Sequence, residues 1–135
     1  MHEDVRRVVV PMGDGGLAAG LINELSGEGV EVIGAQPMTQ PAMAESLNCA
    51  RALTEFRGQP TLCEELEGGV GWRSYRAVKR YVERIHLVSE EEVMDAVVYA
   101  YRKLGLIMEP SAAIVIAAAR DGRLALEDTA GLVVT

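Results

Sequence analysis

A glycine-rich turn lies between two apolar runs near the start of the chain and constrains its fold most. Residues 5–11 read VRRVVVP, residues 13–16 read GDGG, and residues 17–25 read LAAGLINEL. Residues 5–11 are typical of a strand, and residues 17–25 have the composition of an apolar helix. A second β-branched run follows at residues 30–35. This order predicts a β-α-β unit with parallel strands and a right-handed crossover.

The rest of the chain continues to alternate between helices and strands. The predicted helices cover residues 41–53, 74–84, 89–104 and 111–120, and the remaining predicted strands cover residues 85–88 and 131–135. Ser89 and Glu92 match the capping box that begins a helix. The alternation predicts one domain over residues 1–135: a three-layer α-β-α fold of the α/β class with a largely parallel sheet of about four strands.

Charge and hydropathy exclude several classes of partner. The net charge is -7 and the carboxylates are scattered, which disfavours nucleic acid. No apolar run approaches the roughly 20 residues of a membrane span, and the polar, acidic first residues lead us to expect no signal peptide before the first strand. Cys49 and Cys63 lack any paired spacing and are expected to be reduced thiols. We therefore expect a cytoplasmic protein with no nucleic-acid or membrane partner.

The glycine turn is a candidate anion site. Glycines let backbone N–H groups point at a ligand, and the start of a helix adds partial positive charge. A tight turn without a ligand is the alternative. The turn also fits the dinucleotide pattern G-x-G-x-x-A, but the next strand ends in Gln36 rather than the expected carboxylate. A P-loop is excluded because no Gly-Lys-Ser/Thr follows.

Several segments, in order, resemble the threonine/serine dehydratase family of pyridoxal-phosphate (PLP) enzymes, which includes serine racemases. Residues 10–20, VPMGDGGLAAG, are similar to that family's VPxGGGGLxxG. Residues 88–93, VSEEEV, resemble its VSEEEI, and residues 109–113, EPSAA, resemble its VEPSGA segment. Residues 131–135, GLVVT, resemble the last strand before a Ser/Thr-Gly-Gly-Asn. The resemblance covers nearly the whole chain and implies the C-terminal part of the large domain of a fold type II PLP enzyme.

The resemblance implies part of a cofactor site. Glu109 corresponds to the family's glutamate beside the cofactor, with a plain helix N-terminal carboxylate as the alternative. Thr135 aligns with the Ser/Thr that hydrogen-bonds the PLP ring nitrogen. The family holds the PLP phosphate with the main-chain amides of the loop that corresponds here to Gly13, Asp14, Gly15, Gly16 and Leu17.

The resemblance also implies that this chain carries no catalytic residue. The family's Schiff-base lysine lies in a Ser-x-Lys segment upstream of the glycine loop. The only lysines here are Lys79 and Lys103, both expected on solvated surfaces. We expect no covalently bound PLP and no dehydratase activity from the chain alone. It could be a fragment, a subunit of a split enzyme, or a non-catalytic module that binds a phosphorylated ligand or a protein.

Four further residues qualify the expected site. Asp14 replaces a family glycine, and its carboxylate weakens phosphate binding unless it points away. Gln36 and Ala42 stand where some members use Glu and Asp to hold Mg or Ca, so no metal site is predicted. Ser111 is interpreted as a helix N-cap rather than a nucleophile.

Two surfaces bear on partners. Trp72 is predicted to anchor a glycine-rich loop on the core, with an interface role as the alternative. The family segments that this chain lacks would leave a sheet edge and a helix face open. We therefore expect a homodimer, or a partner chain that supplies the N-terminal half.

Overall fold

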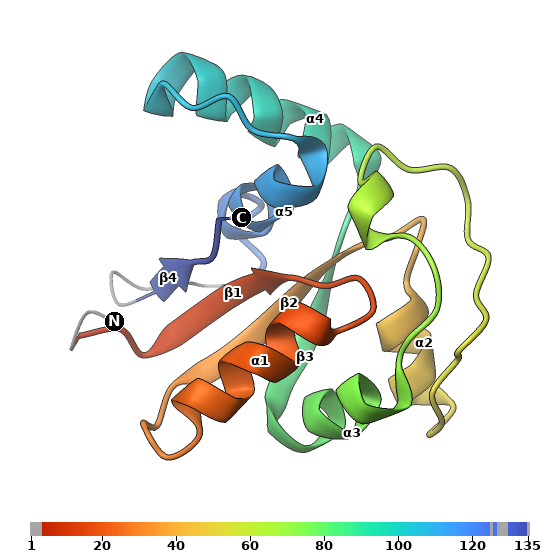
Figure 1. Cartoon of the computed structure of the whole chain (residues 1–135). Coiled ribbons are helices and arrows are strands. Elements are labelled where there is room, and N and C mark those ends of the chain that lie inside the picture. Colours follow the sequence, from red (N-terminus) through yellow and green to blue (C-terminus); the bar gives the residue numbers. More distant parts are fainter. Residues whose placement is uncertain (1–3, 125, 127–129, 135) are drawn as a thin grey trace.

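A four-stranded sheet forms the middle of three layers (Figure 1). The computed structural model describes residues 4–124, 126 and 130–134. The strand order is β3-β2-β1-β4, and all three neighbouring pairs are parallel. This confirms the predicted α/β class and the parallel sheet of about four strands. The strands are β1 (Arg7–Pro11), β2 (Glu31–Pro37), β3 (Val82–Val88) and β4 (Ala130–Leu132).

Helices cover both faces of the sheet, as Figure 1 shows. Side chains alternate along β1, so that Val8 and Val10 face one layer and Val9 faces the other. One layer holds α1, α2 and α3, while in the other α5 lies on the sheet and α4 packs against α5. The bounds of these helices are α1 (Gly16–Leu25), α2 (Ala42–Asn48), α3 (Trp72–Tyr81), α4 (Glu90–Tyr99) and α5 (Pro110–Arg120).

The predicted start of α4 and the predicted end of the continuous helical run at residue 104 are confirmed. The Glu92 amide donates to Ser89 Oγ at 3.1 Å, and the Ser89 amide donates to Glu92 Oε2 at 2.8 Å. The helix continues as a π-helical turn, η2 (Ala100–Leu104), and stops at Gly105, whose φ is 66°. Helix α5 is buried along most of its length, as its apolar sequence predicts. Within the described residues, every helix is too short or too polar to cross a bilayer.

The predicted helix over residues 41–53 was wrong at its end. Helix α2 stops at Asn48, and Ala50 takes a left-handed φ of 56°. The Ser46 hydroxyl donates to the Ala42 carbonyl at 2.7 Å and accepts the Leu53 amide at 3.0 Å. Because this hydroxyl binds the backbone of the segment that follows the helix, the chain leaves the helix before residue 53.

The predicted boundary between the third helix and the third strand was also wrong. Helix α3 begins at Trp72 and ends at Tyr81, and β3 begins at Val82 rather than at residue 85. Val82 pairs with Val32 of β2, so pairing with the sheet overrides the helical periodicity. The last strand covers only Ala130–Leu132, and Thr135 lies outside the described residues.

A polar junction ties the irregular segment at residues 54–71 to α4. The Glu90 carboxylate accepts hydrogen bonds from the Thr39 hydroxyl at 2.8 Å, the Thr61 hydroxyl at 2.6 Å and the Leu62 amide at 2.6 Å. The short 3-10 helix η1 (Glu64–Leu66) follows directly. The junction thereby positions η1 close to the turn between β1 and α1.

Candidate functional site

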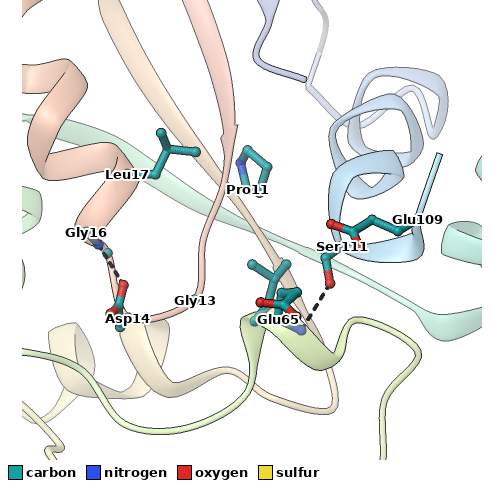
Figure 2. A pocket seen from close by; sticks show the side chains of 10 residues that line it. Pro11, Gly13, Asp14, Gly16, Leu17, Glu65, Glu109 and Ser111 are labelled. Carbon is teal, nitrogen blue, oxygen red and sulfur yellow. Dashed lines mark hydrogen bonds between the residues drawn. The ribbon is translucent and has the colours of Figure 1, made fainter. Parts of the chain in front are cut away.

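A cleft of about 220 Å³ opens where β1 passes into α1 (Figure 2). Three segments that are distant in sequence line it: the loop after β1, the η1 turn and the start of α5. Ligands of open parallel sheets bind beyond the carboxyl ends of the strands, where this cleft lies. The lining residues are Pro11, Gly13, Asp14, Gly15, Gly16, Leu17, Glu65, Leu66, Glu109 and Ser111.

Two glycines of the loop are required by close contacts. Gly15 has a φ of 89°, and a Cβ added there would lie 2.6 Å from Cε of Met43. A Cβ added at Gly13 would lie 3.0 Å from Cα of Leu66. Larger residues would push the loop away from α2 and η1.

Most amides of the loop lack a hydrogen-bond acceptor among the described residues. Across the part of the chain that the structure describes, no acceptor is found for the N–H groups of Gly13, Asp14, Gly15 or Leu17. Gly13 and Gly15 are nevertheless buried. Buried N–H groups nearly always have a partner, so the unpaired N–H groups of these two buried residues beside a cleft favour a ligand that supplies the acceptor. The dipole of α1 favours an anionic ligand.

The Asp14 carboxylate takes one amide of the loop for itself. Its Oδ1 accepts the Gly16 N–H at 2.8 Å, as the dashed line in Figure 2 shows. The carboxylate therefore does not point away from the loop. It places a negative charge beside the amides that an anion would use.

Two more carboxylates line the cleft, and no Lys, Arg or His does so among the described residues. Glu109 holds the N-cap position of α5 without capping it through its side chain. The N-cap interpretation of Ser111 was wrong, because Ser111 lies inside α5 and its Oγ accepts the Glu65 amide at 3.2 Å. This bond, drawn in Figure 2, fixes η1 against the start of α5. The cleft thus combines amide donors with acidic side chains.

Gln36 supports the loop from behind. It is fully buried, its Nε2 donates to the Met12 carbonyl at 3.3 Å, and its Oε1 accepts the Ala44 amide at 3.1 Å. Its side chain therefore links β2 to Met12, which lies between β1 and the glycines of the loop, and to α2. Over the described ranges, no three His, Cys, Asp or Glu side chains gather closely enough to hold a metal ion.

The structure brings together most of the residues that the sequence singled out. Residues 13–17 and Glu109 line one cleft, whereas Thr135 lies outside the described residues. Lys79 and Lys103 are exposed and line no part of the cleft. Glu65 was not predicted, because only the tertiary contact of η1 with α5 brings it there.

Comparison with known sequences relates the whole chain to one family. A family model described as "Pyridoxal-phosphate dependent enzyme" matches residues 1–135. The L-threonine ammonia-lyase of Thermotoga maritima is 36% identical over 119 residues, which are 85% of this chain and 29% of that protein. The catabolic L-threonine dehydratase TdcB of Staphylococcus aureus N315 is 36% identical over 124 residues, which are 90% of this chain and 36% of that protein.

Solved structures share the fold. A threonine deaminase from T.th. superposes with a TM-score of 0.86 at 26% identity, covering 95% of this chain and 47% of its own. A serine racemase from Dictyostelium discoideum gives a TM-score of 0.84 at 23% identity, covering 97% of this chain and 43% of its own. This chain therefore spans less than half the length of these relatives.

Proposed function

The chain belongs to the family of pyridoxal-phosphate-dependent enzymes, and we propose that its cleft holds the phosphate of PLP in an enzyme of the threonine dehydratase type. The unpaired N–H groups of Gly13, Gly15 and Leu17, together with that of Asp14, carry this proposal. Threonine dehydratases among the relatives support the choice of substrate class. In such an enzyme PLP supplies the electron sink for breaking bonds at an amino acid's α-carbon.

The residues of the cleft fit a phosphate group by shape and donor set. Backbone N–H groups approach closely because Gly13 and Gly15 carry no Cβ, and the start of α1 adds partial positive charge. The acidic side chains oppose this, since Asp14, Glu65 and Glu109 line the same cleft. We infer that the remaining positive charge comes from another segment or another chain.

The role of this chain is then to bind and orient PLP rather than to bond to it. Glu109, at the start of α5, would face the cofactor from the side of the cleft opposite the loop. Neither Lys79 nor Lys103 lines the cleft, so the lysine that bonds to PLP would come from the part of the relatives that this chain does not span.

A hybrid enzyme tests this function. The part of the S. aureus dehydratase that this chain does not cover would be joined to it in the relative's own order. We expect the hybrid to retain PLP through gel filtration and to release ammonia from threonine. Gly15→Val should abolish both, because its Cβ collides with Met43, while Gly20→Ala has free space and should change neither. A folded hybrid that retains no PLP would contradict the proposal.

The isolated chain should form no specific bond with PLP. After incubation with PLP and borohydride reduction, mass spectrometry should find only scattered, substoichiometric adducts. Stoichiometric labelling that disappears in Lys79→Arg or Lys103→Arg would contradict the assignment of the reactive lysine to another segment.

We also propose that the chain associates, with a second copy or with a chain carrying the missing half, through the outer face of α4 and η2. Exposed apolar side chains lie along this face at helical spacing: Met94, Val98, Tyr101 and Leu104. Light scattering of the isolated chain should give twice the mass of one chain. The double variant Met94→Glu/Val98→Glu should halve it. A monomeric parent protein would contradict self-association.

A further inference from the structure

Helix α3 carries a dense group of positive charge on an acidic chain. Five of the thirteen basic residues, but only one of the twenty acidic ones, fall within residues 72–84. Four of the five lie on α3 itself, and all four are exposed: Arg73, Arg76, Lys79 and Arg80.

These cations share one face of α3 with an exposed tryptophan. At about 100° per residue, Trp72 and the four cations fall within a sector of about 120°. Tyr75 and Val78 lie outside this sector and are buried against the core. Trp72 is 60% exposed, so the prediction that it anchors a loop on the core was wrong. We call Trp72, Arg73, Arg76, Lys79 and Arg80 the α3 basic face.

Aromatic rings hold two of the guanidinium groups in place. The Arg76 guanidinium lies 5.3 Å from the centroid of the Trp72 ring, and that of Arg80 lies 5.3 Å from the Tyr81 ring. A stacked guanidinium keeps its N–H edges available for a carboxylate. Over the described residues, none of the four cations of the face forms an ion pair.

The α3 basic face costs the isolated helix stability. Arg76 has like-charged neighbours three residues before it, at Arg73, and four residues after it, at Arg80. Arg73 and Arg76 also lie in the first half of the helix, where the helix dipole disfavours cations. The helix contains no acidic residue that would offset this repulsion. A negatively charged binding partner would account for a group of cations that destabilises its own helix.

We propose that the α3 basic face binds an acidic segment of a partner protein. Carboxylates would pair with the guanidinium groups, and an apolar side chain would cover the Trp72 ring. A short segment fits because α3 is only about 15 Å long. The net charge of -7 would repel a long polyanion such as nucleic acid beyond this helix. This inference does not depend on the cofactor site.

Trp72 reports on this face directly because it is the only tryptophan of the chain. The probe is a synthetic helical peptide with Glu at positions i, i+4 and i+7 and one Leu. We expect a saturable blue shift of Trp72 emission and protection from acrylamide, both weakened by salt. The same peptide with Gln in place of Glu should give neither.

Charge reversal tests whether binding of the Glu peptide depends on the α3 basic face or only on the net charge of the chain. Arg76→Glu/Arg80→Glu should weaken binding of the Glu peptide about tenfold or more, because both guanidinium contacts become repulsive. The matched control Arg51→Glu/Arg57→Glu changes the overall charge equally, at exposed positions outside α3 and outside the proposed association face, and should leave binding unchanged. Circular dichroism checks that both variants keep the fold.

Three results would overturn the inference. The first is an absence of saturable change with the Glu peptide. The second is equal weakening by the control pair. The third is tighter binding of a single-stranded oligonucleotide or of phosphatidylserine vesicles than of the peptide, which would assign the face to nucleic acid or to a membrane surface.

Discussion

Asp14 in the glycine loop and Glu90 at the start of α4 each accept a backbone amide, but their surroundings differ. Glu90 is half-buried and receives two threonine hydroxyls as well as the Leu62 amide. Asp14 is exposed and receives only the Gly16 amide, beside several N–H groups that have no acceptor in the described chain.

The difference indicates that the Glu90 junction stabilises the fold, whereas the glycine loop is a surface for a ligand. At the Glu90 junction, polar groups of three segments satisfy one another, and the result is a fixed η1 turn. In the loop the donors exceed the acceptors, so its polar groups are complete only with a partner. A change at the junction should therefore act on stability, and a change in the loop should act on anion binding.

The largest expected effect is on stability at the junction. Glu90→Ala should lower the free energy of unfolding by about 2 kcal/mol, because charge-assisted hydrogen bonds are lost and their donors are left without a partner. Asp14→Ala should lower it by less than about 0.5 kcal/mol. Urea unfolding measures both. Equal losses at the two sites would break the contrast between them.

A smaller effect is expected on anion binding in the loop. Asp14→Gly should strengthen phosphate binding about tenfold, because a like charge a few ångströms away costs about 1–3 kcal/mol at the effective dielectric of a protein surface. Asp14→Asn should capture most of this gain while keeping an acceptor for the Gly16 amide. Isothermal titration with phosphate measures both variants. Unchanged or weaker binding in both would count against the loop as a phosphate site.

The smallest effect is the dependence of stability on pH. Burial alone would raise the pKa of Glu90, but hydrogen bonds from the Leu62 amide and from the Thr61 and Thr39 hydroxyls lower it below its ordinary value. Its stabilising contribution is therefore complete above the ordinary pKa that the group has in the unfolded chain and is lost as pH falls through the lower folded pKa. Glu90→Gln should flatten the acid limb of the stability curve by less than about 1 kcal/mol. An identical acid limb in the variant would refute this assignment.

The parts of the molecule that the sequence predicted well depend on local patterns. The strand, glycine loop and helix at residues 7–25 follow from β-branched and apolar runs, and the capping box at Ser89 follows from local spacing. Where tertiary contacts decide, the prediction failed. The Ser46 hydroxyl ends α2 by accepting a hydrogen bond from the Leu53 amide, and pairing with β2 places Val82 in a strand rather than in a helix.

The candidate site shows the same division. The loop at residues 13–17 could be predicted because three glycines fall within four residues, and Glu109 because the family resemblance marks it. The position of Glu65 could not be predicted, because it depends on the packing of η1 on α5. The hydrogen bond between Asp14 and Gly16 could not be predicted either, because it depends on the loop's conformation.

The central claim, that the glycine loop is the phosphate side of a PLP site, is tested most directly by amide NMR. The labelled chain and its Asp14→Gly variant would be titrated with PLP and with pyridoxal, which lacks the phosphate. We predict saturable shifts at the amides of Gly13, Gly15 and Leu17 with PLP, larger in the variant, and none there with pyridoxal. Shifts of equal size with both ligands, or shifts with PLP confined to other parts of the chain, would contradict the claim.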